Sequence, residues 1–131
     1  MNEKEIELYQ VDIEEDFQKE VRRFVKKKNF RTLTNQIEEL IIKVKNGEFE
    51  GDKIIISDYP TPHDIYKLRL PVPDIKVGKS NGYRIIYMVV TEYKIVVFLI
   101  IYYKKEQPTV SDTYIHGLID GYFINSSPEE E

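Results

Sequence analysis

The sequence predicts an α+β domain in which helices pack on a sheet built mainly of antiparallel strands. Three observations lead to this prediction. Apolar residues recur with the period of an amphipathic helix in the first third of the chain and again near its end. Between these segments the chain is rich in Ile, Val, Tyr and Phe, which favour strands. The 131 residues, 41% of them hydrophobic, supply one core and fit a single domain.

The N-terminal third begins with an alternating stretch, 6–11, that predicts a first strand. A helix is expected next, with Asp12 as its N-cap and with acidic residues in its first turn, where the helix dipole favours anions. Apolar residues at helical spacing mark its buried face: Phe17, Val21, Phe24 and Val25. The three lysines at 26–28 suit a helix C-terminus better than they indicate a nucleic-acid patch.

A second helix follows after a few residues around Asn29, so the two helices should pack as an antiparallel hairpin. Its apolar positions show the same spacing: Leu33, Ile37, Leu40, Ile41 and Val44. Asn46 and Gly47 provide the stop signal. Residues 48–63, which contain Gly51, Pro60 and Pro62, are expected to be irregular.

Three further strands are predicted at 65–70, 83–91 and 94–103. The last two are joined by a tight turn near Glu92 and Tyr93, which predicts an antiparallel hairpin, and their apolar character indicates that both faces are covered. A final helix should start at Ser111, with its apolar face formed by Ile115, Leu118, Ile119 and Tyr122. The expected domain spans 1–124, and 125–131 is expected to be a disordered acidic tail.

Composition excludes several classes of protein. The chain has no cysteine, which removes disulfides and thiolate metal sites, and its N-terminus has no secretory signal. The longest apolar run, Ile95 to Tyr103, is half of what a membrane-spanning helix needs. His63 and His116 lack carboxylates at metal-ligand spacing, so loop or surface roles are expected for them. We therefore expect a cytoplasmic protein that needs no metal and no cofactor.

Charge is distributed unevenly along the chain, although the net charge is only −4. Residues 61–110 carry 8 Lys and Arg against 4 Asp and Glu, whereas residues 111–131 carry 0 against 5. This pattern permits a basic face on an acidic protein and does not establish one, because charge runs are usually solvated surface.

Basic residues on the predicted strands are the candidates for chemistry. Lys67 and Arg69 are two positions apart and therefore project from the same face of their strand. Arg84 lies near the start of the next strand, and an antiparallel pairing should bring it close to Tyr103–Lys105 at the end of the last one. The competing interpretation is that these are strand-end cations that prevent aggregation.

Such a cluster has the groups needed to cleave RNA without a metal. The 2′-hydroxyl attacks the adjacent phosphate, and arginine stabilises the added negative charge through its planar fork. A lysine whose pKa is lowered by neighbouring cations can accept a proton, and a tyrosine or another lysine can protonate the leaving 5′-oxygen. DNA lacks the nucleophile and would not react.

Residues 66–115 add a family resemblance to this chemistry. Three pieces carry it: YKLRL at 66–70, GKSNGYRIIY at 78–87 and IYYKKE at 101–106, followed by VSD at 110–112 and Ile115. In order and spacing these pieces resemble the RelE/HigB superfamily of type II toxins. The resemblance covers about 50 residues closely, and the helical hairpin before them fits the same layout.

The resemblance implies a mostly antiparallel, four-stranded sheet that cups the helices, with a cleft for RNA on the sheet surface. It implies a metal-independent mRNA endonuclease that works on the ribosome and is inhibited by a cognate antitoxin protein. By position, Arg84 would hold the scissile phosphate, Lys67 and Arg69 would position the backbone or share the role of base, and Tyr103 or Lys104 would be the acid. The flanking lysines expected to bind RNA are Lys76, Lys79 and Lys105.

Two other functions remain open on the same fold, because function depends on the site and not on the fold. One is a toxin of the ParE type, which inhibits DNA gyrase and has no nuclease activity. The other is a catalytically degenerate relative that only binds a partner, which the acidic net charge favours. The nuclease is favoured by the presence of its expected site residues, Lys67, Arg69, Arg84 and Tyr103. An antitoxin partner is expected in every case.

Overall fold

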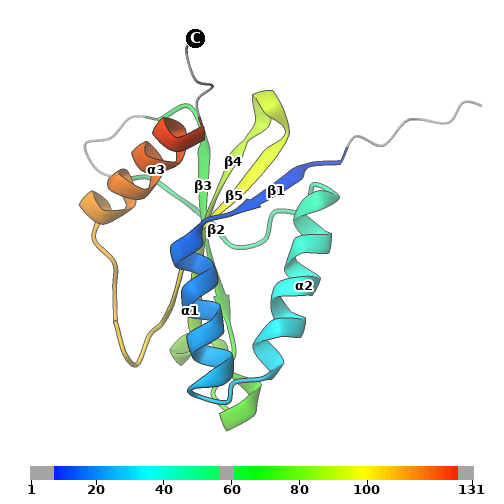
Figure 1. The fold of residues 1–131 in the computed structure, drawn as a ribbon, viewed down its shortest axis with the longest axis vertical. Helices are drawn as coiled ribbons and strands as arrows, with labels where there is room; N and C mark the ends of the chain where they lie inside the picture. The colour runs from blue at the N-terminus through cyan, green and yellow to red at the C-terminus, as the bar shows by residue number, and fades with distance from the viewer. Residues whose placement is uncertain (1–7, 57–60, 127–131) are drawn as a thin grey trace, which may run out of the picture.

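A computed structural model describes residues 8–56 and 61–126. Within these ranges three α-helices pack on a mixed, five-stranded sheet with the order β1-β5-β4-β3-β2. Figure 1 shows α1 and α2 side by side in front of the sheet, with α3 to one side of them. The predicted α+β class, with an N-terminal helical hairpin and a C-terminal helix, is confirmed, although the described sheet has one strand more than expected.

The helical hairpin is formed by α1 (Glu15–Lys26) and α2 (Thr32–Lys45). Of the apolar residues predicted to face the core, Phe17, Phe24, Leu33, Ile37, Leu40 and Val44 are buried, and Val21, Val25 and Ile41 are partly buried against the same core. The connection bends at Asn29, whose φ of 61° lies in the left-handed region that asparagine tolerates better than most residues. The chain leaves α2 through Asn46 and Gly47, as the stop signal predicts.

The N-terminus of α2 is capped from a distant part of the chain. No residue at the start of the helix supplies a side-chain cap, and the carboxylate of Asp74 accepts hydrogen bonds from the backbone N–H of Thr32 at 3.0 Å and from its hydroxyl at 3.1 Å. An anion at this position satisfies an otherwise unpaired N–H and suits the helix dipole. The turn that contains Asp74 is therefore tied to the junction between the two helices.

The first strand lies later than the sequence predicts. β1 is Gln10–Ile13, so only the end of the predicted strand 6–11 belongs to it, and residues 6 and 7 lie outside the described ranges. The assignment of Asp12 as a helix N-cap is wrong, because Asp12 lies within β1 and α1 follows an extended Glu14. The strand pairs in parallel with β5, an arrangement that the alternating pattern alone does not specify.

A short strand, β2 (Asp52–Ile54), occupies part of the segment expected to be irregular. It pairs antiparallel with β3 (Asp64–Leu70) through three residue pairs. Gly51 precedes it with a φ of +106°, and a Cβ at this position would lie 2.7 Å from the carbonyl oxygen of Lys67. This close backbone approach requires glycine. Three residues are too few for a recognisable alternating pattern, so the sequence does not predict this strand.

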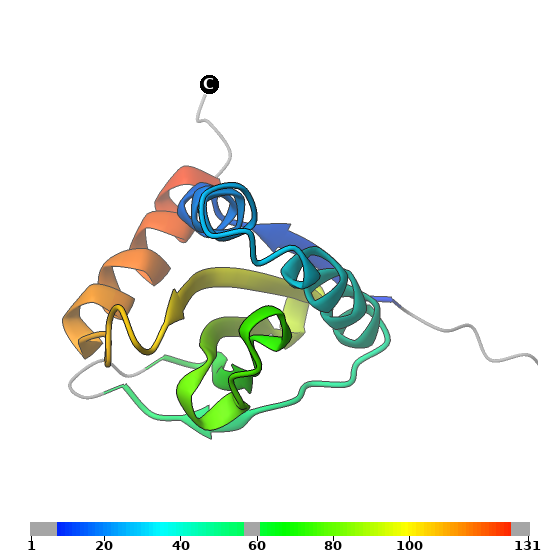
Figure 2. The ribbon, with the colours of Figure 1, turned by 90° about the horizontal axis from the view of Figure 1, so that it is seen from below.

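The centre of the sheet is formed by β3, β4 (Tyr83–Val90) and β5 (Ile95–Tyr103). The strand β4 pairs antiparallel with both β3 and β5. Every residue of β4 is buried, as expected for a strand covered on both faces. One face, here called the hairpin face, packs against α1 and α2, and the opposite face, here called the α3 face, packs in part against α3. Figure 2 shows α1 and α2 end-on and α3 running obliquely, with its N-terminal end away from the hairpin helices.

A β-bulge interrupts the pairing of β4 with β5. Ile86 pairs with Ile100 and Tyr87 pairs with Phe98, so Leu99 has no partner across the strand. Leu99 and Ile100 both contribute to the core on the α3 face, whereas the usual alternation would place them on opposite faces. Beyond the bulge, every side chain of β5 is therefore turned over relative to a regular strand.

The C-terminal helix, α3, runs from Asp112 to Ser126. The hydroxyl of Ser111 accepts a hydrogen bond from the backbone N–H of Tyr114 at 3.1 Å, which makes Ser111 the N-cap, so the helix begins one residue after the start that the sequence predicts. The helix continues through Asn125, so the predicted disordered tail begins too early, and the rest of that tail, 127–131, lies outside the described residues. The Tyr122 hydroxyl donates to Asp12 at 2.6 Å and ties α3 to β1.

The Tyr83 hydroxyl gives a test of the packing under the hairpin. It is buried beside Phe24 and Phe30, has no hydrogen-bond partner among the described residues, and burial raises its pKa. We expect Tyr83→Phe to raise the free energy of unfolding by about 1 kcal/mol, because it removes a buried unsatisfied hydroxyl. Tyr87→Phe is the control: its hydroxyl donates to the Glu50 carbonyl, so its loss should cost about 1 kcal/mol in urea denaturation. Equal losses in both variants would contradict the prediction.

Candidate functional site

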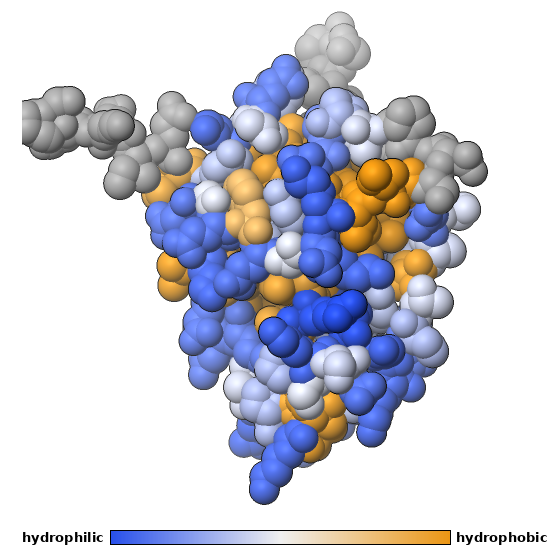
Figure 3. Space-filling model, turned by 180° about the vertical axis from the view of Figure 1, so that it is seen from behind, coloured by the Kyte–Doolittle hydropathy of each residue, from blue (hydrophilic) through white to orange (hydrophobic). Residues whose placement is uncertain are grey.

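Cationic side chains from β3 and β4 meet on the α3 face. Arg69 is the direct cross-strand partner of Arg84, and Lys67 is the partner of Ile86, which belongs to the core on that face. Directly opposed residues of an antiparallel pair project to the same side, so Arg84 joins Lys67 and Arg69, which the sequence predicts to share one face of their strand, on the α3 face. Figure 3 shows strongly hydrophilic residues gathered across the middle of the side turned away from α1 and α2.

Arg84 is the buried member of this group, with 6% of its surface exposed. Its Nη1 donates to the carbonyls of Lys79 at 2.9 Å and Tyr83 at 3.2 Å, and its Nη2 donates to the carbonyl of Ser80 at 2.9 Å. Burial lowers the pKa of Arg84, and the positive charge of Arg69 lowers it further. The backbone carbonyls thus compensate a buried charge that has no carboxylate partner among the described residues.

Arg69 differs from Arg84 in its surroundings. It is exposed, and among the described residues its guanidinium makes no hydrogen bond and no ion pair. It lines an open groove with a volume of about 680 Å³ together with Lys67, Lys79, Leu70 and Pro71. Like charges directly opposite one another destabilise a sheet, so the Arg69–Arg84 pair leaves a position where an added anion is favourable.

Two carboxylates stand at the other wall of this groove, on the segment that leads into β2. Glu50 forms an ion pair with Lys43 at 3.0 Å, and Asp52 is the cross-strand partner of Lys67. The groove is therefore cationic along β3 and acidic along β2. A polyanion bound in it would lie toward β4.

Lys104 joins the site from the end of β5. Its Nζ donates to the carbonyl of Ser80 at 3.3 Å, the same oxygen that accepts a hydrogen bond from Arg84. Its backbone N–H donates to the carbonyl of Gly82 at 3.0 Å. The predicted proximity of Arg84 and Lys104 is thus confirmed, through a shared oxygen.

Tyr103 lies elsewhere. It pairs with Tyr83 and is buried on the hairpin face, where its ring contacts Phe24 at 6.5 Å and Phe30 at 5.7 Å between centroids. The expectation that Tyr103 would meet Arg84 at one site is therefore wrong. The cause is the bulge at Leu99, without which the regular alternation would place Tyr103 on the α3 face.

Two other phenols lie on β5 and α3, and Tyr102 is the one that pairs with a cationic residue. Tyr102 is the cross-strand partner of Arg84, and its burial raises its pKa, an effect that Arg84 partly offsets. Tyr114, on the first turn of α3, lines two small cavities of about 250 and 270 Å³ beside Ile100. Burial raises the pKa of Tyr114, and Asp16 is the next cause. Because the bulge reverses the facing of Tyr102, the sequence does not predict that this residue lies beside Arg84. No local pattern predicts the surroundings of Tyr114, because the residues near it belong to α1 and β5.

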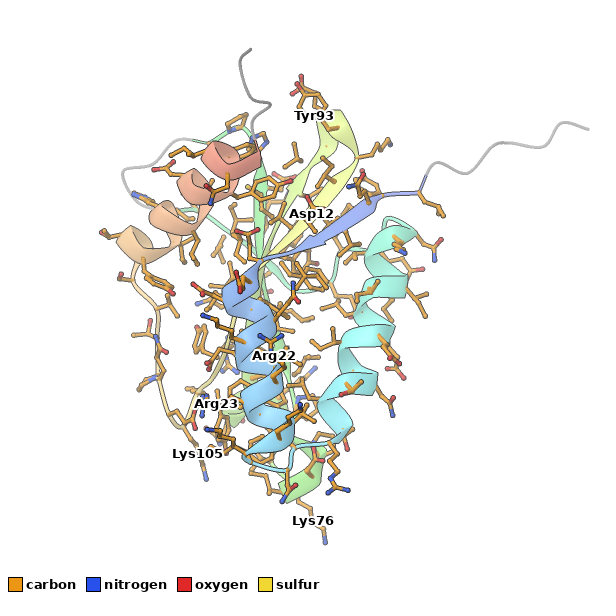
Figure 4. The ribbon with its side chains drawn as sticks, viewed as in Figure 1. Asp12, Arg22, Arg23, Lys76, Tyr93 and Lys105 are labelled. Atoms are coloured by element: carbon orange, nitrogen blue, oxygen red, sulfur yellow. The ribbon has the colours of Figure 1, made fainter. Side chains whose placement is uncertain are left out.

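The remaining predicted RNA-binding lysines divide between two places. Lys79 lines the groove, whereas Lys76 and Lys105 project at the end of the molecule farthest from Tyr93, as Figure 4 shows. Lys76 ends the turn that begins at Pro73 and has a φ of 59°. These two lysines are placed to extend a contact beyond the groove and not to line it.

An ion-pair network fixes the segment that carries Lys104 to α1. Glu106 bonds to Arg23 at 2.6 Å and to Lys28 at 2.8 Å, and Arg23 also pairs with Glu20 at 2.9 Å. The hydrogen bond from Arg23 holds the pKa of the Glu106 carboxyl below its usual range, and Lys28 lowers it further. Lys28 thus forms an ion pair with Glu106, so the three lysines at 26–28 are more than solvent-exposed charges at the end of α1.

A folded-state pKa below that of the unfolded chain stabilises the protein above the unfolded value of about 4.3. The contribution is lost as the pH falls through the folded value. We therefore expect Glu106→Gln to lower the free energy of unfolding at pH 7 by about 1 kcal/mol and to reduce the loss of stability below pH ~4.3, measured by urea denaturation across pH. An unchanged acid dependence in Glu106→Gln would disprove this assignment.

Metal ligands and membrane segments can be assessed in the same described residues. No group of three or more His, Asp or Glu residues there is placed to hold a metal ion. His63 stacks on Phe123 at 5.3 Å between ring centroids. No helix in the described part is long and apolar enough to cross a bilayer.

Comparison with solved structures identifies this arrangement, a helical hairpin on one face of the sheet and cationic strand residues on the other, as a RelE-type fold. A solved structure of a mutant of the Escherichia coli toxin RelE in the free state is similar, with a TM-score of 0.50 and 22% identity over 77% of this chain and 88% of that one. The isolated E. coli RelE toxin aligns over 86% of this chain and 97% of its own, at 23% identity and a TM-score of 0.49. No family model and no curated protein matches. The resemblance in sequence is confirmed at the level of the fold.

Proposed function

We propose that this protein is the toxin of a type II toxin–antitoxin pair and that it cleaves mRNA without a metal ion. The observation that carries the proposal is the cross-strand pair of Arg69 and Arg84, in which Arg69 lines an open groove together with Lys67. A fold shared with proteins named toxin RelE supports it. Opposed arginines with no carboxylate between them favour binding of an anion, and the phosphates of RNA are anions in a regular row.

The chemistry follows from the positions of these groups. The 2′-oxygen forms a bond to the phosphorus while its proton passes to a base, for which Lys67 is the candidate. Arg69, exposed in the groove, stabilises the charge that develops on the phosphate oxygens. The bond from phosphorus to the 5′-oxygen then breaks, and Lys104 supplies the proton to that oxygen. The products are a 2′,3′-cyclic phosphate and a free 5′-hydroxyl.

The partner of such a toxin would be an antitoxin with an acidic segment that covers the cationic face and folds on binding. The target would be mRNA in the cytoplasm, on the ribosome. Lys76 and Lys105, at one end of the molecule, would add contacts to the RNA backbone. Expression of the chain without a partner is expected to arrest growth.

The test is induction of the protein in growing bacteria with mapping of mRNA 5′ ends, together with incubation of purified protein and RNA in the presence of EDTA. New ends inside translated messages, and cyclic phosphate termini that EDTA does not prevent, are the expected results. Growth arrest without new ends would reject the nuclease in favour of a gyrase inhibitor of the ParE type. No arrest and no cleavage would identify a degenerate, partner-binding relative.

A further inference from the structure

The turn between β3 and β4 is held by hydrogen bonds from side chains of the candidate site. Its residues, 78–82, include a 3₁₀ helix at Lys79–Asn81. The carbonyls of Lys79 and Ser80 both accept hydrogen bonds from the Arg84 guanidinium, and the Ser80 carbonyl also accepts one from Lys104. The turn is therefore fastened by two cationic side chains.

Gly82 closes the same turn by a close approach to the end of β3. A Cβ there would lie 2.1 Å from the carbonyl oxygen of Leu70 and 3.1 Å from the Cα of Pro71. This approach brings the turn against the residues that line the groove, and the exposed side chain of Lys79 lines it as well. The position of Lys79 thus depends on how the turn is held.

The two arginines of the pair differ in how many of their N–H donors remain free to bind a ligand. Arg84 makes three hydrogen bonds to backbone carbonyls and is 6% exposed. Arg69 is exposed and has no hydrogen bond among the described residues. A phosphate at the site would reach the free fork of Arg69, whereas binding to Arg84 would require the turn to release its carbonyls.

We propose that Arg84 is a positioning residue, which holds the Lys79–Gly82 turn so that Lys79 joins Arg69 and Lys67 on the RNA backbone. This inference rests on the proposed function in one respect only, the nature of the bound ligand. It assigns the phosphate contact to Arg69 and Lys79, and it gives Arg84 a role different from the one that the family resemblance implies.

The first experiment uses the free protein and needs no RNA. Arg84→Ala is expected to increase amide hydrogen exchange at Asn81 and Gly82 by at least tenfold, with Arg69→Ala unchanged as the matched control. Arg84→Lys should behave like Arg84→Ala, because a single ammonium cannot span two carbonyls as a guanidinium does. This second variant keeps the charge and keeps the test valid if the alanine variant does not fold. Unchanged exchange in Arg84→Lys would overturn the proposal.

The second experiment measures binding of a labelled single-stranded 2′-deoxyoligonucleotide, which cannot be cleaved because it lacks the nucleophile. Lys79→Ala should weaken binding about three- to tenfold, the size of one phosphate interaction, and should have no further effect once Arg84 is lysine. Independent effects of the two substitutions would mean that the contact made by Lys79 does not depend on Arg84 and would overturn the proposal. If the wild-type protein binds no oligonucleotide, the proposed function fails, and the exchange data alone decide the role of Arg84.

The cleavage kinetics provide a readout that a merely structural role would not give. Arg84→Lys is expected to raise KM for RNA about three- to tenfold while kcat stays within threefold, because Lys79 binds the phosphate equally in the ground state and in the transition state. A residue that contacts the phosphate in the transition state would instead lower kcat by about 100-fold. That result would overturn the proposal.

Discussion

Arg69→Ala is expected to lower the rate of RNA cleavage by about 100-fold and to abolish growth arrest, which is the largest functional effect of any single change. Arg69 is the one arginine of the cross-strand pair whose fork is open to the groove in the described part of the chain. Its loss would remove the group that we propose stabilises the added charge on the phosphate. The substitution leaves no cavity and breaks no hydrogen bond, so stability should change by less than about 0.5 kcal/mol.

The measurement is a single-turnover cleavage rate with purified protein, beside urea denaturation of the same sample. Arg22→Ala is the matched control, because Arg22 is an exposed arginine on α1, which packs on the opposite face of the sheet. Its rate should stay within twofold of the wild type. Equal rates for Arg69→Ala and the wild type would remove Arg69 from the site and leave the proposed mechanism without its principal cation.

Gly82→Ala is expected to destabilise the protein by at least about 3 kcal/mol, the largest effect on stability. The added Cβ would lie 2.1 Å from the carbonyl oxygen of Leu70, a distance that no side-chain rotation can relieve, because the obstacle is backbone. The end of β3 or the start of β4 must therefore move, and the pairing of Leu70 with Tyr83 lies at this point. The expected result is a lower urea midpoint with an unchanged m-value.

Gly117→Ala provides the control for this substitution. Gly117 lies within α3, and a Cβ there meets nothing within 4 Å. Alanine in a helix interior is favoured over glycine by up to about 1 kcal/mol, so this variant should be more stable than the wild type. Similar midpoints for Gly82→Ala and Gly117→Ala would show that the turn accommodates a side chain and is not a fixed element.

The elements that could be predicted from the sequence are those with a long periodic pattern. The apolar positions of α1 and α2 repeat over three or more turns, and β4 and β5 are nearly continuous apolar runs, so each pattern has a single good interpretation. What could not be predicted depends on contacts between distant residues. Asp74 caps a helix that starts 42 positions earlier in the chain, and three-residue β2 exists only because β3 is beside it.

The candidate site shows the same division. Lys67 and Arg69 could be placed on one face because they lie two positions apart on a strand with regular alternation, and the structure adds Arg84 to that face through its pairing with Arg69. Tyr103 could not, because one unpaired residue, Leu99, reverses the facing of everything after it, and nothing in the local sequence marks that residue. The sequence of β5 reads equally well with or without a bulge when both faces of the sheet are buried.

The parallel pairing of β1 with β5 has a consequence for how the chain acquires its structure during synthesis. Gln10 pairs with Ile95, so the first strand has no partner until β5 has left the ribosome, a wait on the order of ten seconds at usual elongation rates. The helical hairpin is complete long before the sheet that covers it, and its apolar face stays exposed to chaperones in that interval. A nascent chain of this protein therefore carries an unpaired first strand and an uncovered helical hairpin until β5 has emerged.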